Sequence, residues 1–192
     1  MPETLAGLQT ALTATRQVVA GITADQWLLP TPCTEWTVAD LTAHIVLGNR
    51  MFAQILTGGP APDLADGARA DRGQIEGDRL PAYDEASDRL MAAFGSAGVL
   101  DQLFTVPFGT VPGSVALHLR ITELLVHGWD LARATGQRIE VPDSLAEQEL
   151  AFSELALSQV PPGRSPFAPP QPVMADAAPL DRLASLLGRP TT

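Results

Sequence analysis

The chain has 192 residues, a length that favours one domain with its own hydrophobic core. Its 12 cationic residues are all arginine and stand against 22 Asp+Glu, and the net charge of -10 argues against nucleic acid or an anionic membrane surface as a partner. Because the sequence contains no lysine, mechanisms that need a lysine amine as nucleophile are excluded.

The sequence also indicates the cellular compartment of the protein. Cys33 is the only cysteine, so an internal disulfide is excluded. The N-terminal residues lack the positive region and apolar core of a secretory signal peptide, and no apolar stretch approaches the roughly 18 residues of a membrane-spanning helix. We therefore expect a soluble, cytoplasmic protein in which residues 1–192 form a single domain.

The first half of the chain predicts two helices and a long loop. Leucine and valine recur at helical spacing over residues 3–20, which predicts an amphipathic helix that ends at Gly21. Thr37 followed by Asp40 is typical of a capping box, so a second helix, carrying His44, is expected from about 38 to about 56. Residues 57–80 are rich in Gly, Asp, Arg and Pro and predict a long polar loop.

The second half predicts three further helices. A third helix is expected over about 81–96, followed at 103–113 by a short hairpin or extended connection. Ser114 is expected to cap a fourth helix that stops at Gly136, and a fifth helix is expected over 143–160. A proline-rich tail then precedes a short closing helix. The pattern predicts an all-α fold: a four-helix bundle with an additional C-terminal helix and a proline-rich tail.

Three side chains form a candidate metal site. Glu123 and His127 are four residues apart in an apolar helical stretch, so both project from one face of that helix. His44 lies in a similar apolar pattern on another helix. Two imidazoles and one carboxylate converging inside a bundle would supply three protein ligands and leave a further coordination position for water or a substrate.

Simpler interpretations of the same residues remain open. A single histidine on an apolar face is more often a hydrogen-bonded core residue than a metal ligand, which applies to His44. The Glu123–His127 pair could equally be a surface pairing along one helix, worth about 0.2 to 0.5 kcal/mol. The apolar neighbours Leu124, Leu125 and Trp129 argue against a surface position for the pair.

Other polar residues nearby are assigned different roles. His118 precedes His127 by nine residues and is expected on the opposite face of the helix, away from the site. Asp130 returns to the face of Glu123 and is expected to accept a hydrogen bond from a ligand's N–H, or to pair with an inward-facing arginine such as Arg133 or Arg50.

The remaining reactive or aromatic side chains are given packing roles. Cys33 could supply a thiolate, but a small packed side chain is the favoured interpretation. Trp27, Trp36 and Trp129 are expected in the core or as pocket walls. The sequence contains no G-x-S-x-G motif, P-loop or dinucleotide fingerprint, so the common nucleophile and nucleotide classes are excluded.

Two segments resemble a known family when taken together. T-P-C-T-E-W-T-V-A-D-L-T-A-H-I-V-L-G-N-R and R-I-T-E-L-L-V-H-G-W-D-L-A-R-A-T-G are similar to the DinB-like metal-binding superfamily, in the branch of the mycothiol-dependent maleylpyruvate isomerase N-terminal domain. The ending D-R-L-A-S-L-L-G-R-P resembles small actinobacterial members of that branch. The resemblance implies a four-helix bundle that binds a divalent metal, usually zinc, through His44, Glu123 and His127.

The resemblance also implies a chemistry. In that family the open metal position receives a low-molecular-weight thiol such as mycothiol, which the cation would hold as a thiolate ready to attack an electrophile. A metal- and thiol-dependent transferase or isomerase acting on a small electrophile is therefore expected, and a homodimer is an option. Those isomerases carry a further C-terminal domain, which is not expected here because the sequence stops after the bundle and a proline-rich tail, so maleylpyruvate isomerisation itself is not the expected reaction.

Two alternatives remain for the function, and the metal is not fixed. The bundle could be a non-catalytic metal-binding scaffold or sensor, or a metal-dependent hydrolase that uses a bound water. Zinc is favoured because imidazoles supply two of three ligands, although nickel or iron would accept the same set.

Overall fold

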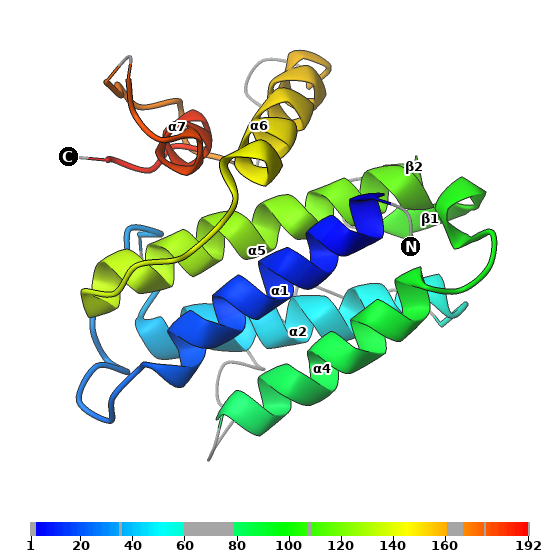
Figure 1. Cartoon of the computed structure of the whole chain (residues 1–192). Coiled ribbons are helices and arrows are strands. Elements are labelled where there is room, and N and C mark those ends of the chain that lie inside the picture. Colours follow the sequence, from blue (N-terminus) through cyan, green and yellow to red (C-terminus); the bar gives the residue numbers. More distant parts are fainter. Residues whose placement is uncertain are drawn as a thin grey trace.

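Four helices of the computed structural model form a closed bundle. The structure describes residues 3–34, 36–59, 79–106, 109–160, 167–174 and 176–191. The bundle helices are α1 (Glu3–Ala20), α2 (Val38–Leu56), α4 (Arg79–Phe94) and α5 (Gly113–Thr135). Helices α1 and α2 each pack against both α4 and α5 (Figure 1). The predicted all-α bundle is confirmed, and α2 and α5 lie in contact, which brings His44 toward Glu123 and His127.

Local sequence signals explain the ends of α2 and α5. The Thr37 side chain accepts a hydrogen bond from the Asp40 backbone N–H at 3.2 Å, and the Thr37 N–H donates to the Asp40 carboxylate at 3.1 Å. The predicted capping box is therefore present. Helix α5 stops at Gly136, whose φ of +67° is a left-handed conformation that glycine adopts without strain.

The start of α5 differs from the prediction. Strands β1 (Leu103–Val106) and β2 (Gly109–Pro112) form an antiparallel hairpin, and the helix begins immediately after it, with Pro112 as N-cap. Ser114 is therefore not the cap. The Gly113 N–H donates to the Gln102 carbonyl at 2.8 Å. A side chain at Gly113 would also overlap the short helix η2 (Val99–Asp101), so tertiary contacts set this helix start.

The core is continuous across the bundle and reaches the C-terminal helices. It is built mainly from leucine, isoleucine and valine on the inward faces, including Leu8, Leu41, Leu90, Leu117, Ile121, Leu124, Leu145 and Leu183. Helices α6 (Asp143–Ser158) and α7 (Pro179–Leu186) pack against each other and against α5 (Figure 1). They therefore cover α5 outside the four-helix bundle.

The predicted loops are only partly described. Most of the polar loop predicted at 57–80 and residues 161–166 of the predicted proline-rich tail lie outside the described residues. Residues 167–174 contain no helix or strand. None of the described helices is long and apolar enough to cross a membrane.

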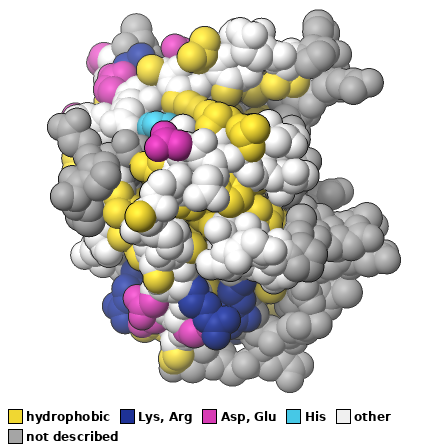
Figure 2. All heavy atoms as spheres, turned by 90° about the vertical axis from the view of Figure 1, so that its right-hand side faces the viewer, with side chains coloured by type: hydrophobic (Ala, Val, Ile, Leu, Met, Phe, Trp, Pro, Cys, Tyr) yellow, Lys and Arg dark blue, Asp and Glu magenta, His cyan; other side chains and the backbone are white. Residues whose placement is uncertain are grey.

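Ion pairs join the outer surfaces of the bundle helices. Arg16 of α1 contacts Asp84 of α4 through two nitrogens at 2.6 and 2.7 Å, and Arg50 of α2 contacts Glu85 of α4 at 3.0 Å. Figure 2 shows arginine and acidic side chains gathered at the lower end of one face, with apolar side chains in separate patches above them. Each pair is at least one-third exposed, so its contribution to stability is small.

Candidate metal centre

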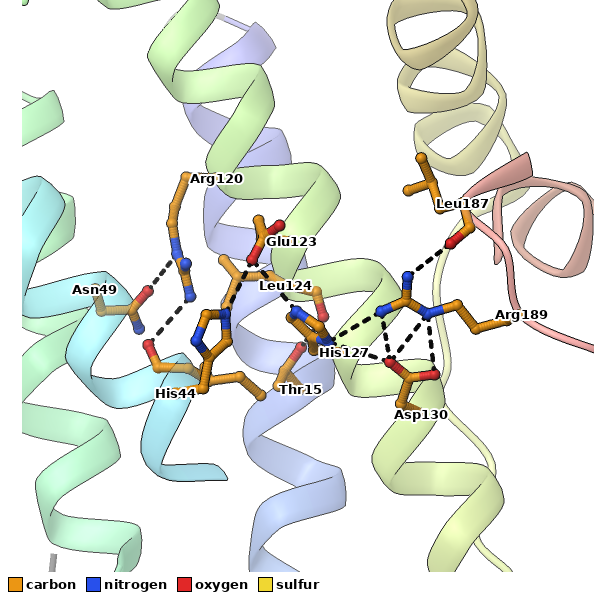
Figure 3. A network of polar contacts seen from close by, with 11 residues as sticks. Thr15, His44, Asn49, Arg120, Glu123, Leu124, His127, Asp130, Leu187 and Arg189 are labelled. Carbon is orange, nitrogen blue, oxygen red and sulfur yellow. Dashed lines mark hydrogen bonds and ion pairs between the residues drawn. The ribbon is translucent and has the colours of Figure 1, made fainter. Parts of the chain in front are cut away.

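Helices α2 and α5 bring three candidate ligands together. The Nε2 atoms of His44 and His127 lie 3.2 and 3.3 Å from the same atom, Oε2 of Glu123 (Figure 3). One ligand atom from each of the three residues lies within 4.8 Å of the others. The helical spacing of Glu123 and His127 and the packing of α2 on α5 together produce this convergence.

The donor atoms have separations suited to a transition metal. Around a tetrahedral zinc ion, neighbouring ligand atoms lie about 3.3 Å apart, because Zn–N and Zn–O bonds are about 2.0 to 2.2 Å long. The two N···O separations at Glu123 match that value. Imidazole nitrogen and carboxylate oxygen are also the donor types that zinc accepts. The residues present therefore fit a divalent metal.

Asp130 orients the ring of His127 from the side away from Glu123. Its carboxylate lies 3.1 Å from His127 Nδ1 and is fully buried. A carboxylate in this position fixes the ring so that Nε2 points toward Glu123. This is the geometry of a carboxylate–histidine pair behind a metal ligand.

Arg189 completes the arrangement from the C-terminal segment. Its guanidinium lies 3.1 Å from Asp130 Oδ2 and 3.5 Å from His127 Nδ1, and it donates to the Leu187 carbonyl at 2.7 Å (Figure 3). Arg189 and Asp130 are both buried. The predicted pairing of Asp130 with an inward-facing arginine is present, but the arginine is Arg189 and neither of the two that were suggested: Arg133 contacts Asp181, and Arg50 contacts Glu85.

Electrostatics give the three candidate ligands different protonation behaviour. Burial lowers the pKa of His44, and the hydrogen bond to Glu123 only partly opposes this effect. Burial acts in the same direction at His127, but the charges of Glu123 and Asp130 outweigh it and raise the pKa of this ring. Burial alone would raise the pKa of Glu123, yet His127 and His44 bring it well below its ordinary value. The site therefore presents an ionised carboxylate beside two imidazoles of unequal basicity.

Trp36 forms one wall of the site. Its ring centroid lies 4.5 Å from that of His44, edge to face, and 6.0 Å from that of His127, stacked. The prediction that Trp36 lies in the core or lines a pocket agrees with this position. The indole therefore packs against both candidate imidazole ligands on one side of the site.

Cys33 lies on the Asp130 side of His127. Its thiol could join His127 and Asp130 in a second group of metal-binding atoms within 4.8 Å of one another. Burial raises the pKa of the Cys33 thiol, which favours the neutral form. Asp130 already contacts the Arg189 guanidinium, so a metal there would compete with a resident cation. The trio around Glu123 is the better candidate.

His118 faces away from the candidate centre. Its Nδ1 lies 2.8 Å from the buried Glu149 carboxylate, and its ring stacks on Phe152 of α6. Glu149 also accepts a hydrogen bond from Thr122 at 3.0 Å. The predicted position on the opposite face of the helix is thus what the structure shows, and His118 joins α5 to α6.

Comparison with protein families identifies the chain. The family model of the mycothiol maleylpyruvate isomerase N-terminal domain matches residues 8–132, which is more than half of the chain. The chain belongs to this family. The matched region of the mycothiol maleylpyruvate isomerase N-terminal domain includes His44, Glu123, His127 and Asp130, whereas Arg189 lies beyond it.

Individual relatives agree with this assignment. An uncharacterized protein of Mycobacterium tuberculosis, found in two strains, is 36% identical over 183 residues, which cover 94% of this chain and 94% of that protein. The crystal structure of the mycothiol-dependent maleylpyruvate isomerase superposes with a TM-score of 0.65 at 18% identity, covering 80% of this chain and 69% of that one. A histidine-to-alanine mutant of that enzyme gives a TM-score of 0.66.

A more distant structure shares the same bundle. The crystal structure of a DinB-like protein from Bacillus subtilis superposes with a TM-score of 0.56 at 16% identity, covering 73% of this chain and 96% of that one. The predicted DinB-like fold is therefore confirmed.

Two residues at the site were not identified from the sequence. Arg189 is separated from Asp130 by 59 positions, and nothing in the local pattern links them. Arg120 lies three residues before Glu123, and its guanidinium is buried between α5 and α2. The presence of Arg120 within an otherwise apolar helical stretch is the sequence signal that could have indicated a buried, functional arginine.

Proposed function

We propose that this protein binds a divalent metal ion, zinc foremost, through His44, Glu123 and His127. The observation that carries the proposal is the convergence of both imidazole Nε2 atoms on one carboxylate oxygen at 3.2 and 3.3 Å. Two imidazoles and one carboxylate suit zinc, and the same set would accept nickel or iron. Asp130 supports the proposal because it holds the His127 ring in the required orientation.

The number of candidate ligands and their partial exposure favour a reaction centre over a closed structural zinc site. Three protein ligands leave a further coordination position, as in catalytic zinc sites. The His44 side chain is 34% exposed and Glu123 is 18% exposed, whereas His127 is 7% exposed. A small molecule would therefore reach the ligands from the His44 side. This difference favours an enzyme over a non-catalytic scaffold or sensor.

We further propose that the open position receives a low-molecular-weight thiol of the mycothiol type, for transfer to or isomerisation of a small electrophile. The support is the family, which is that of the mycothiol maleylpyruvate isomerase N-terminal domain. When bound, the metal would lower the pKa of the thiol and hold the thiolate. Glu123 supplies the negative charge that binds the cation, Asp130 orients His127, and Trp36 packs against both imidazoles.

Elemental analysis of protein purified without a chelating tag tests the metal site. Wild type is expected to contain about one zinc or similar ion per chain, as for a mononuclear site. The double variant His44→Ala, His127→Ala is expected to contain none. The variant His118→Ala is the matched control, because this histidine lies on the opposite face of α5 and should leave the metal content unchanged.

Thiol titration then tests the chemistry. A thiol that enters the coordination sphere of cobalt-substituted protein is expected to change its visible absorption, and the double variant should show no such change. Wild type that takes up no metal after reconstitution would refute the metal site. Metal-loaded protein that is indifferent to thiols would refute the thiol-dependent reaction and leave the metal site standing.

A further inference from the structure

A buried arginine lies beside the candidate ligands. Arg120 is on α5 one turn before Glu123, and only 1% of its surface is exposed. None of the ion pairs found among the described residues includes Arg120. Burial of a guanidinium is costly unless its hydrogen bonds are satisfied, so packing alone does not account for this residue.

The hydrogen bonds of Arg120 cross from α5 to the turn of α2 that carries His44. Its Nε donates to the Asn49 side-chain oxygen at 2.8 Å, and its Nη2 donates to the Ile45 carbonyl at 3.1 Å (Figure 3). Ile45 directly follows His44. Two nitrogens of the planar guanidinium therefore bind α2 at Ile45 and Asn49, which lie one and five residues after His44.

The surroundings of Arg120 are shaped to the guanidinium. A Cβ atom at Gly48 of α2 would lie 3.0 Å from Arg120 Cζ and closer still to Nη1, so a side chain there would displace the guanidinium. The Asn49 amide also donates to Ser87 of α4 at 3.4 Å, which fixes the acceptor of Arg120 from a third helix. The position of the Arg120 guanidinium is thus fixed by contacts with α2 and, through Asn49, with α4.

We propose that Arg120 is a positioning residue of the metal site: its guanidinium fixes the His44-bearing turn of α2 against the Glu123-bearing turn of α5. This role rests on the proposed metal binding. The ligands come from two different helices, so their spacing depends on how α2 sits on α5. Among the described residues, Arg120 bonds across this junction beside the contact that the candidate ligands His44 and Glu123 themselves make.

Two variants that keep the positive charge test the role. Arg120→Lys retains a cation but replaces the two-pronged fork with a single ammonium. Gly48→Ala leaves Arg120 intact and displaces its guanidinium with a methyl group. Loss of the charge itself, as in Arg120→Met, would also relieve repulsion of the metal and obscure the geometric effect. Thr122→Val is the control, because it removes a buried hydrogen bond on the α6-facing side of α5.

Each protein is loaded with Co²⁺, and both its affinity in competition with a chelator and its visible spectrum are measured. Arg120→Lys and Gly48→Ala are expected to bind about 10- to 100-fold more weakly than wild type, as when outer partners of metal ligands are removed. Their spectra should show an altered coordination geometry. Thr122→Val should match wild type in both measurements, because its hydrogen bond lies away from the ligands.

Three outcomes would overturn the proposal. The first is an unchanged affinity and spectrum in the charge-retaining variants that remain folded by circular dichroism. The second is an equal change in Thr122→Val, which would indicate a general loss of stability. The third is the absence of Co²⁺ binding by wild type, which would refute the metal site itself, whereas the first two outcomes leave the metal site intact.

Discussion

The central residue of the candidate site is Glu123, whose single Oε2 atom faces both histidines. In the metal-free protein His127 has a carboxylate against each ring nitrogen, Glu123 on one side and Asp130 on the other. Both carboxylates stabilise the imidazolium form, and they raise the pKa of His127 against the opposing effect of burial. In the metal-free protein, the positive charge of protonated His127 therefore compensates the two carboxylates, as a bound cation would.

This protonation predicts pH-dependent metal uptake. The raised pKa of His127 means that its protonated form stabilises the metal-free protein fully below about pH 6.5. That contribution is lost as the pH rises through the raised pKa. Because a ligating imidazole must release its proton, apparent zinc affinity should increase from about pH 6 to about pH 8.

Chelator competition at the two pH values measures this dependence. The variant His118→Ala should show the same increase as wild type, because His118 pairs with Glu149 on the other side of α5. An affinity that does not change with pH would contradict a proton held on His127.

At the scale of elements, the approach of α1 to α5 depends on Gly128. A Cβ atom at this position would lie 2.8 Å from Thr15 Oγ1 and 2.6 Å from Ile139 Cδ1. Thr15 donates to the Leu124 carbonyl at 3.0 Å, so the contact lies next to Glu123 along α5. A methyl group here would push the two helices apart.

Gly128→Ala is therefore expected to lower the free energy of unfolding by about 1–3 kcal/mol, as overpacking of a tight core does. The measurement is urea denaturation of the metal-free protein. Gly7→Ala in α1 is the control, because its Cβ would meet only the ends of the Leu145 and Ile121 side chains. That change should be neutral or stabilising, since alanine favours helix more than glycine does. Equal effects of the two changes would contradict the close approach at Gly128.

The elements also show how far sequence reasoning reaches. The bounds of α1 and α2 were predictable because periodicity and a capping box are local signals. The start of α5 was mispredicted at Ser114 because contacts with Gln102 and Val99 decide it. The convergence of Glu123 and His127 followed from helical spacing, but their distances to His44 depended on how α2 packs on α5.

At the scale of the whole molecule, the C-terminal segment is joined to the bundle through a buried ion pair. Arg189 is the cation that contacts Asp130, and their side chains are 8% and 0% exposed. Removal of Arg189 leaves the buried Asp130 carboxylate with His127 as its remaining ionisable partner, and breaking a buried pair costs about 3–5 kcal/mol. Arg189→Met should lower the stability of the metal-free protein by that amount, measured by urea denaturation.

The same segment offers a matched control. Arg182 of α7 pairs with Glu147 of α6 at 2.8 Å, but these side chains are 39% and 49% exposed. Arg182→Met should therefore change the stability by only about 0–1 kcal/mol. Similar losses in the Arg189 and Arg182 variants would contradict a special role for the buried pair.

The position of Trp36 beside both histidines means that its fluorescence should respond to a metal ion bound at the site. The indole lies within a few ångströms of both histidine rings, close enough for its excited state to transfer energy to an open-shell ion held by them. Zinc has a filled d shell and lacks such absorption, whereas cobalt and copper have it. Fluorescence of a form with Trp27 and Trp129 replaced by phenylalanine would therefore distinguish these metals as they exchange, without any added dye.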